Sequence, residues 1–494
     1  MIQKAKEKIK NNYILLVIAT LFFLMYAALS WVRHYNFQSN AYDLGIFNQT
    51  LYNYAHLSLG PNTLRHVDTL FGDHFEPILF LFTPLYYLFG TYTLLVVQVM
   101  AIILGGFGVY KLIKEHTGHK NYAIIATTIF FSSFGVFQAL AFDYHNNVIG
   151  AMAIPWILYY LLKKDYFKYY LIFILCLSCK ETMALVGIMI GVSIICFNRK
   201  QWQHGLITMS VSVFWFLLTT QVLIPFFNNN SQYDHWQSFS NLGTGPLDAL
   251  YNAIIDPVSF VFRFVDNNDK IQMWWIIILS GGLFAFFYPR YSIMLLPLLS
   301  QKFLAQNSAY WGYYFHYNIE LMIIVVIAGS VFISENIANK NLKYFILLSL
   351  CIINIGYSFK LEFYDNSKLT KIFTCDYYFN SQQRDLVQAI AMIPVSSDVI
   401  AQNHLIPHLA NRKNINVLPH FTHSEDKNIS NNAYQCPSLV NHEYLILNLA
   451  DESVWPMTSI EQVKKIIVDG YDHNSDVKTI YNSNNVILYQ LSLN

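Results

Sequence analysis

The sequence predicts a mainly α-helical fold: a polytopic membrane bundle of about eleven transmembrane helices, followed by a small C-terminal α/β domain. Three observations lead to this prediction. The 494 residues are 54% hydrophobic and only 12% charged, whereas soluble domains average about 25% charged residues. Apolar runs recur from residue 13 to residue 359, too many for one soluble core. After residue 360 these runs shorten, and charged, Asn and Ser residues become more frequent.

Each long apolar run is expected to form a transmembrane helix, because backbone polar groups inside a bilayer must be hydrogen-bonded within their own segment. The first run follows a lysine-rich N-terminus and is longer than the apolar part of a signal peptide, so we expect an uncleaved helix there. The expected spans are residues 13–32, 91–113, 121–140, 147–162, 166–180, 182–198, 204–227, 271–288, 291–306, 316–334 and 342–359.

The positive-inside rule orients these spans. With the N-terminus in the cytoplasm, residues 1–359 form the transmembrane domain, 33–90 and 228–270 are its large outer loops, and 360–494 form an extracytoplasmic domain. The sequence therefore predicts a multi-pass protein of the cell membrane. Every short basic loop then lies on the cytoplasmic side, as shown by Lys111, Lys114, Lys120, Lys163, Lys164, Lys168, Arg199, Lys200, Arg290, Lys340 and Lys343.

Residues 166–198 are assigned to two short spans, because basic clusters flank both ends and both ends should therefore be cytoplasmic. Lys180 and Glu181 then lie at an outer turn. Short spans are tolerated where a cavity or a thinned bilayer replaces hydrocarbon. Residues 77–90 are apolar but too short to span comfortably and hold two prolines, so we expect a re-entrant or interfacial piece. The amphipathic stretch 246–265 is expected to lie along the membrane surface.

The C-terminal segment shows alternating helix and strand patterns, which are typical of a small α/β domain. His404 and His408 are four residues apart, but without a glutamate between them we expect them on the surface of this domain and not in a metal site. The patterns predict helices at 381–391, 403–413 and 459–470, strands at 398–402, 414–420 and 443–450, and a hairpin at 477–491 around Asn-Ser-Asn-Asn.

Unusual polar residues gather on the outer side under this topology. Ionisable residues near membrane depth are costly and tend to mark function. We therefore expect Asp43, His74, Asp143 and Lys180 to line one outward cavity. The full outer set is Asp43, Asp73, His74, Glu76, Asp143, His145, Lys180, Glu181, Tyr313 and His316.

The first candidates lie in the first outer segment. Asp43 belongs to YDLGIFNQT (42–50), and its carboxylate could hold a metal ion or act as a general base. Alternatively, it caps a juxtamembrane helix. The segment GDHFEP (72–77) supplies two carboxylates and His74, groups that suit metal binding or proton transfer. A solvated loop that caps the next helix is the alternative.

Two further pairs follow later spans. Asp143 and His145, in FDYHNN (142–147), could face one pocket from a loop, or could be interfacial polar residues with hydrogen-bond partners. Lys180 could meet a phosphate as a point charge that Glu181 orients. The alternative for this pair is an ion pair that closes a tight turn.

Several of these segments together resemble a known family. YDLGIFNQ (42–49), DHFEPILFLFTPLYYLFG (73–90), FDYH (142–145), Lys180-Glu181-Thr182 and IPVSSDVIAQNHLIPHLANRKNINVLP (393–419) look like the predicted membrane proteins designated domain of unknown function twenty seventy-nine. The resemblance spans most of the chain. That family is similar in layout to the GT-C glycosyltransferases, multi-span enzymes that take a sugar from a polyprenyl-phosphate donor and whose first large outer loop carries an essential acid.

The resemblance implies a GT-C-like integral-membrane glycosyltransferase of the cell envelope. It would transfer a sugar from a polyprenyl-phosphate donor, in contact with membrane lipid, to a glycan or protein acceptor on the outer face. Asp43 matches the first-loop acid and would be the general base. His74, Asp143 and His145 fall on the family's other polar motifs and complete the candidate catalytic set.

Lys180 and Glu181 match a Lys-Glu motif of the family and would bind the donor phosphate together with His316, which otherwise lies in an aromatic segment typical of a membrane interface. The family's motif often continues with an acid, but Thr182 stands here, so a third acid is not part of this site. A divalent cation, Mg²⁺ or Mn²⁺, could be held by Asp43 and His74.

Two other classes stay open. A transporter or lipid flippase would use the same polar residues as a substrate path, although no inverted repeat is visible in the sequence. A non-catalytic envelope protein would tolerate substitution of these residues. The net charge of +1 gives no indication of nucleic-acid binding.

Overall fold

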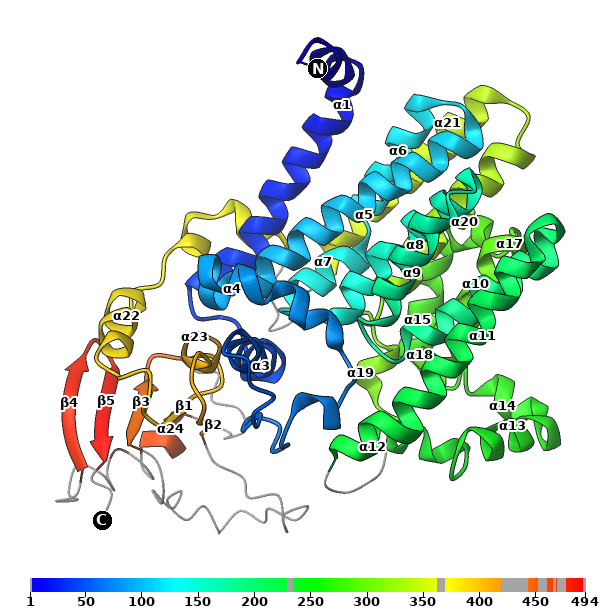
Figure 1. Ribbon diagram of the computed structural model, residues 1–494. Helices are drawn as coiled ribbons and strands as arrows, with labels where there is room; N and C mark the ends of the chain where they lie inside the picture. Colours follow the sequence, from blue (N-terminus) through cyan, green and yellow to red (C-terminus); the bar gives the residue numbers. More distant parts are fainter. Residues whose placement is uncertain are drawn as a thin grey trace.

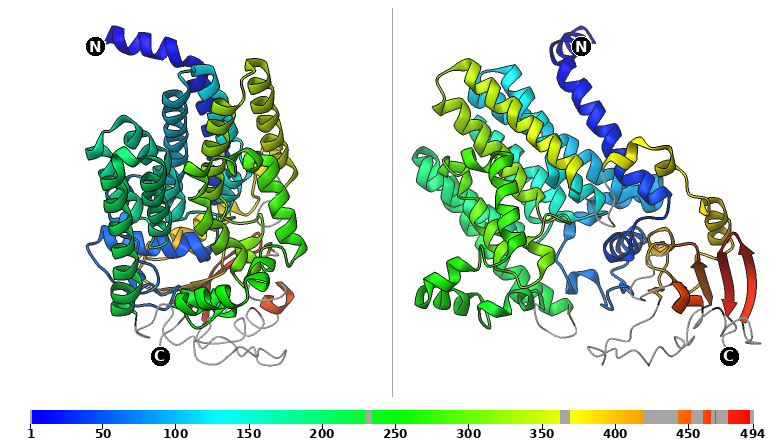
Figure 2. Two further views of the ribbon diagram at one scale, coloured as in Figure 1. Left: turned by 90° about the vertical axis from the view of Figure 1, so that its right-hand side faces the viewer. Right: turned by 180° about the vertical axis from the view of Figure 1, so that it is seen from behind.

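The computed structural model describes residues 2–228, 234–361, 369–418, 443–451, 460–464, 468 and 477–491. It is mainly helical, with a bundle of long helices and a small sheet beside one end of the bundle (Figure 1). The N-terminus lies at the opposite end from the sheet (Figures 1 and 2). This arrangement agrees with the predicted fold class of an apolar helical bundle with a small α/β unit.

Every predicted span coincides with one or more helices. Within the described residues, five helical segments are long and apolar enough to cross a membrane, or six if the bent pair α6–α7 is one span, so the number eleven stays a prediction. The helices are α1 (Ile2–Ala27), α2 (Arg33–Tyr35), α5 (Thr93–Thr117), α6 (Lys120–Phe131), α7 (Phe134–Ala141), α8 (Asn146–Lys163), α9 (Tyr166–Leu177), α10 (Met183–Phe197), α11 (Trp202–Leu218), α12 (Ile224–Phe227), α15 (Asn268–Ile277), α16 (Leu283–Ala285), α17 (Pro289–Ser292), α18 (Leu295–Leu304), α20 (Ile319–Asn336) and α21 (Lys340–Lys360).

Two predicted spans are bent, and helix α21 satisfies the backbone at both bends. Helices α6 and α7 meet at 40°, where the Ser358 hydroxyl donates to the Ser132 carbonyl at 2.6 Å. Between α15 and α16 the chain turns at Gly281, whose φ of +124° favours glycine. There the Asn354 amide donates to the Ser280 carbonyl at 3.2 Å. Freed carbonyls at membrane depth are thus hydrogen-bonded, as a low-dielectric setting requires.

The two segments predicted as large outer loops, 33–90 and 228–270 and from here on called the outer segments, form short helices. Predicted piece 77–90 consists of a 3₁₀ turn, η4 (Pro77–Phe82), and helix α4 (Thr83–Phe89). Helix α3 (Ile46–Ala55) precedes it, and α19 (Ser308–Trp311) is a short turn near the other outer loop. The amphipathic stretch forms α13 (Pro246–Ile255) and α14 (Pro257–Phe262), whose apolar side chains are exposed, including Leu250, Tyr251, Ile254, Ile255, Val258, Val261 and Phe262.

The sheet has five strands in the order β2-β1-β3-β5-β4. Strand β1 pairs in parallel with β2 and β3, with Ile400 opposite Asn416 and Leu445. Strand β5 is antiparallel to both β3 and β4. The predicted hairpin is confirmed, and it turns at Asn484 and Asn485, which both have positive φ, as in a two-residue hairpin turn. The strands are β1 (Val399–Ala401), β2 (Ile415–Val417), β3 (Tyr444–Asn448), β4 (Val477–Ser483) and β5 (Val486–Leu491).

The helices of this unit are α22 (Gln383–Ala391), α23 (Ile406–Leu409) and α24 (Ile460–Val463). Much of the predicted helix 459–470 lies outside the described residues. The prediction that His404 and His408 lie on the surface is wrong. His404 is 3% exposed, and His408 stacks on His34 with ring centroids 3.9 Å apart, because α23 packs against the outer segment that follows α1.

Candidate active site

Two adjoining cavities lie where the outer segments meet the bundle. The first, of about 270 Å³, is rich in charged residues and is lined by Asp43, Arg65, Asp73, His74, Glu76, His145, Lys180, His235 and His316, among others. The second, of about 290 Å³, is mainly apolar and includes Leu185, Phe216, Phe239, Leu242 and Leu304. The two share His74, Asn147, Lys180, His235, Tyr310, His316 and Tyr317. The polar cavity and the apolar cavity therefore meet at shared residues, among them the basic side chains of His74, Lys180, His235 and His316.

Asp43 pairs with His145 across the polar cavity. It lies on the π-helical turn η2 (Ala41–Gly45), where Tyr42 departs from helical geometry; such turns recur at functional sites. The Asp43 Oδ2 atom is 2.9 Å from His145 Nε2. The residue that caps α3 is Gly45, with no side-chain cap, so the capping alternative for Asp43 does not hold. Its carboxylate is one-third exposed and open to a ligand in the cavity.

His145 is fixed from two sides. Its backbone N–H donates to the Gln98 Oε1 atom at 2.9 Å, just before helix α8 begins. Its ring stacks on that of His316, with centroids 3.4 Å apart. His316 is 4% exposed, and within the described residues its Nδ1 atom has no hydrogen-bond partner. A buried polar atom without a partner usually awaits water or a ligand, so His316 is a candidate for binding one.

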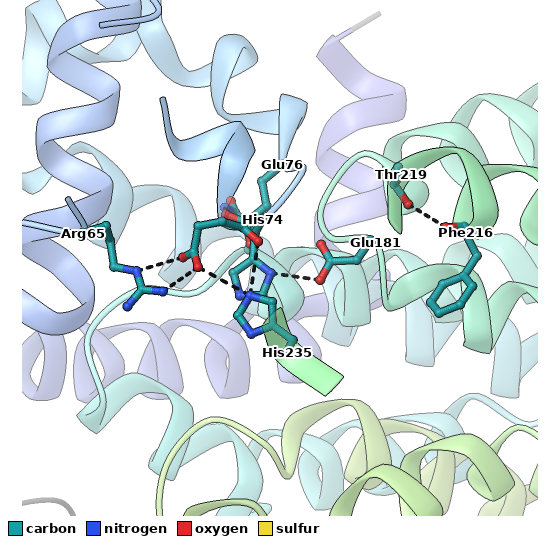
Figure 3. Close-up of polar contacts among 9 residues, drawn as sticks. Arg65, His74, Glu76, Glu181, Phe216, Thr219 and His235 are labelled. Atoms are coloured by element: carbon teal, nitrogen blue, oxygen red, sulfur yellow. Dashed lines mark hydrogen bonds and ion pairs between the residues drawn. The ribbon is translucent and has the colours of Figure 1, made fainter. Parts of the chain in front are cut away.

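Lys180 and Glu181 occupy the turn between α9 and α10; Lys180 lines both cavities and Glu181 lines the apolar one. Glu181 Oε1 lies 2.9 Å from His74 Nδ1, as Figure 3 shows for these two side chains. Burial alone would raise the pKa of Glu181, but the positive charges of His74 and Lys180 and the hydrogen bond from His74 lower it to about 2. Glu181 is thus ionised and bonded to His74, which lies on a different segment of the chain.

Asp73 lies between two cationic or imidazole partners. The guanidinium of Arg65 contacts both carboxylate oxygens, at 3.0 and 2.5 Å, and His235 Nε2 is 3.4 Å from Asp73 Oδ1. Burial would raise the pKa of Asp73, but the charge of His74, the hydrogen bond from His235 and the Arg65 guanidinium hold it far below its usual range. His235 in turn stacks on His74 at 4.0 Å between centroids (Figure 3).

Glu76 is the buried acid of the site. It is 2% exposed, and its Oε2 atom accepts a hydrogen bond from the Asn146 amide at 2.9 Å. Burial, reinforced by the charge of Glu181, raises the pKa of Glu76 to about 8, against the opposing effects of Lys180 and Asn146. This carboxyl group is therefore largely protonated near neutral pH and does not compete with Asp43 as a base.

Asp143 is the one predicted site residue that does not line either cavity, which contradicts our expectation that it shares one cavity with Asp43, His74 and Lys180. Asp143 has a positive φ of 59°, a conformation that is uncommon for residues other than glycine. Its Oδ2 atom accepts a hydrogen bond from the Asn40 backbone N–H at 2.8 Å. The residue supports the segment that carries Asp43 and does not face the cavity.

Among the described residues, one group could supply three ligand atoms to a metal ion: Asp73, His74 and His235, whose ligand atoms lie within 4.8 Å of one another. Asp43, named with His74 in the sequence prediction, is not in this group. Because Glu181 holds His74 Nδ1, the Nε2 atom of His74 would be the ligand, an arrangement typical of metal-binding histidines. Two imidazoles and a carboxylate suit Zn²⁺ better than Mg²⁺, although Arg65 shares the Asp73 carboxylate.

Sequence reasoning offered Asp73 and Glu76 only as candidate carboxylates beside His74, and it missed Arg65 and His235. Asp73 and Glu76 are close to His74 in sequence, but no local pattern shows whether their carboxylates bind a metal ion or cap the next helix. His235 comes from the second large outer loop, and no spacing relates it to His74. Its partnership is set entirely by how the outer segments fold together.

Comparisons with known proteins agree with this architecture. Residues 33–476 match the family described as Predicted membrane protein (DUF2079). A search of curated proteins found no match. The crystal structure of ArnT from Cupriavidus metallidurans bound to undecaprenyl phosphate is similar, with a TM-score of 0.55 and 10% sequence identity over 97% of this chain and 98% of that chain.

A cryo-EM structure of the arabinofuranosyltransferase AftD from Mycobacteria gives a TM-score of 0.49 at 12% identity, over 98% of this chain and 42% of that one. At such low identity the likeness to ArnT shows the fold alone. ArnT is a GT-C glycosyltransferase, and its similar overall fold agrees with the GT-C-like layout that the sequence predicts.

Proposed function

Because this chain belongs to the DUF2079 family of predicted membrane proteins, and its fold is GT-C-like, we propose that it is an integral-membrane glycosyltransferase. It transfers a sugar from a polyprenyl-phosphate donor to a glycan or protein acceptor on the outer face of the cell membrane. The proposed topology has eleven spans, a cytoplasmic N-terminus and an extracytoplasmic sheet unit.

The observation that supports this proposal most is the junction of the two cavities. The apolar cavity suits the first isoprene units of a lipid donor, and the polar cavity suits a sugar. Lys180 and His316 line both, so a phosphate at the junction would lie between its lipid and its sugar. The solved ArnT structure is bound to undecaprenyl phosphate, and a donor of that kind fits this division of chemistry.

In the proposed mechanism, Asp43 is the general base. Its carboxylate takes the proton of an acceptor hydroxyl, and the oxygen attacks the anomeric carbon of the sugar. The bond between that carbon and the phosphate oxygen breaks, and polyprenyl phosphate leaves with the electron pair. Lys180 stabilises the negative charge on this leaving group. His145 lies 2.9 Å from Asp43. Its imidazole keeps the Asp43 carboxylate oriented and can share the proton that this carboxylate takes from the acceptor.

The remaining polar residues position these groups. Glu181 holds His74, and Arg65 holds Asp73, so the outer wall of the cavity is a connected network. A divalent cation, if one is used, would be held by Asp73, His74 and His235 and would neutralise charge on the leaving phosphate. The sequence prediction paired His74 with Asp43 as metal ligands. In the present proposal Asp73 and His235 take the place of Asp43.

The proposal is tested with purified protein and radiolabelled undecaprenyl-phosphate-linked pentoses and hexoses, with cell-envelope glycans and proteins as acceptors. We expect release of undecaprenyl phosphate together with label in an acceptor. Reconstitution in vesicles distinguishes the alternatives: movement of the donor between leaflets without its cleavage would support a lipid flippase and contradict the proposal. Neither transfer nor movement with any donor would contradict it as well.

A further inference from the structure

We infer that the sheet unit fixes the position of Asp43 and that Asn403 is the positioning residue through which it acts. The inference rests on the proposed function, in which Asp43 is the base, and it gives the C-terminal unit a direct part in the active site. It starts from the backbone just before Asp43, which makes most of its polar contacts with residues far along the chain.

Asn403 binds two consecutive residues of the Asp43 segment. Its Oδ1 atom accepts a hydrogen bond from the Ala41 N–H at 2.9 Å, and its backbone carbonyl lies 3.0 Å from the same nitrogen. Its Nδ2 atom donates to Asn40 Oδ1 at 2.9 Å. From the other side, Asp143 accepts from the Asn40 N–H. Both residues are thus held between the membrane bundle and the sheet unit.

This bracing matters because the Asp43 segment is irregular. Asp43 lies on a π-helical turn that contains a non-helical residue, Tyr42, and no side chain caps this turn. The turn has its own hydrogen bond from the Gly45 N–H to the Asn40 carbonyl at 3.1 Å, but the N–H groups of Asn40 and Ala41 are bound by residues elsewhere in the chain. Without Asn403, the Ala41 N–H would be a buried donor lacking its side-chain acceptor.

Asn403 is itself anchored in the sheet. It follows strand β1 by two residues and is 6% exposed. The neighbouring Gln402 holds the end of strand β3, because its Oε1 atom accepts from the Asn448 N–H at 2.5 Å and its Nε2 atom donates to the Asn448 carbonyl at 3.3 Å. A displacement of Asn403 would therefore disturb the sheet as well as the Asp43 segment.

Apolar packing also holds the sheet unit close to the turn that carries Asp43. A Cβ atom at Gly45 would lie 2.8 Å from the Cγ2 atom of Ile406, so α23 rests directly on the backbone of the Asp43 turn. Helix α3, which continues from this turn, lies beside α23 (Figure 1). The Gln49 amide donates to the Lys413 carbonyl at 2.8 Å, which extends the contact along α3. The interface is continuous from residue 40 to residue 49.

The functional consequence is geometric. A shift of about 1 Å in a catalytic group can lower the rate by about 100-fold. Loss of the Asn403 contacts would let the turn move relative to His145, so the distance of 2.9 Å between Asp43 and His145 would no longer be enforced. The donor-binding residues Lys180 and His316 lie on other elements, so donor affinity should change little.

The test compares full-length Asn403→Ala with Tyr481→Phe, which removes a hydrogen bond to Asp385 at the far edge of the same sheet. In Asn403→Ala we expect hydrogen exchange in residues 38–46 to accelerate at least tenfold. We also expect kcat to fall about 10- to 100-fold, with KM for the undecaprenyl-phosphate-linked sugar within twofold of wild type. The control should match wild type in both. Unchanged exchange and kcat in Asn403→Ala would overturn the inference.

A second pair of variants covers the case in which Asn403→Ala does not fold. Gly45→Ala should lower kcat because its new methyl group meets Ile406, and adding Ile406→Ala should restore it, since that change removes the contacting atom. Failure of the double variant to recover would contradict the inference. The exchange measurement needs no substrate, so it supports or overturns the bracing of this segment even if Asp43 proves not to be the base.

Discussion

The Nε2 atom of His145 lies 2.9 Å from the Oδ2 atom of Asp43, and the His145 ring stacks on His316. Three segments far apart in the sequence therefore meet at one carboxylate. Asp43 and Lys180 both line the polar cavity, so the group proposed to accept a proton and the group proposed to stabilise the leaving phosphate face one space.

Lys180 is expected to bind the donor phosphate. Replacing it in Lys180→Met should raise KM for an undecaprenyl-phosphate-linked sugar by about 10- to 100-fold, because a charge-assisted contact is lost at a site shielded from water. Lys168→Met is the matched control, since Lys168 is exposed and pairs with Asp165. Steady-state kinetics would measure both variants, and equal KM values for Lys180→Met and wild type would remove Lys180 from the donor site.

The raised pKa of Glu76 predicts that the stability of the folded protein falls as pH rises. Its pKa is about 8 in the folded protein against an ordinary value of 4.5. Between these values the folded state binds more protons, so stability is lost as pH rises from about 4.5 through 8. Glu76→Gln, which can still accept from Asn146, should therefore raise Tm by several degrees at pH 8.5 and leave it unchanged at pH 4.5.

Thermal unfolding in detergent across this pH range measures the effect. Glu115→Gln is the control, because Glu115 is exposed and pairs with Lys163 at 3.2 Å. If Glu76→Gln and wild type lose stability in parallel as pH rises, the carboxyl group is not the source of the loss.

We expect a metal ion to bind at the group formed by Asp73, His74 and His235. Zn²⁺ added to the metal-free protein should bind with an affinity that His235→Ala lowers by at least about tenfold, because one of three ligands is removed. His56→Ala, which changes an exposed histidine of the first outer segment, should bind as wild type does. Calorimetric titration measures both. The assignment fails if His235→Ala binds Zn²⁺ as tightly as the control.

Much of the helical architecture could be predicted from sequence, because a bilayer demands long apolar runs and the chain supplies them. The bends were not predicted. The turn at Gly281 and the break at Ser132 depend on Asn354 and Ser358 of α21 reaching the freed carbonyls, and this pairing is not encoded near either bend. Strands β1 to β5 were predicted because they are short runs rich in strand-forming residues and bounded by turn residues.

The candidate site could be predicted only in part. Asp43, His74, His145, Lys180 and His316 were expected on one side, and all five line the polar cavity. Composition and the predicted topology were enough for this prediction, because few ionisable residues lie at the ends of the predicted spans. Partners could not be predicted, because His145 meets Asp43 and His235 meets His74 through tertiary packing alone.

Two residues illustrate the limit of spacing arguments. Asp143 and His145 are two apart and could have faced one pocket, but His145 lines the polar cavity beside Asp43, whereas Asp143 accepts a hydrogen bond from the Asn40 backbone N–H. His408 was expected at the surface, yet its Nε2 atom lies 2.7 Å from the His34 carbonyl. A short helix such as α23 gives no amphipathic pattern long enough to reveal which neighbour will cover it.

The central claim is tested most directly by sugar transfer in Asp43→Asn. The matched control is Asp68→Asn, which changes an exposed aspartate of the same outer segment. We predict that Asp43→Asn folds, binds undecaprenyl phosphate as wild type does, and loses at least about 100-fold in kcat because the general base is gone, while Asp68→Asn retains full activity. Full transfer activity in a folded Asp43→Asn protein would contradict the account.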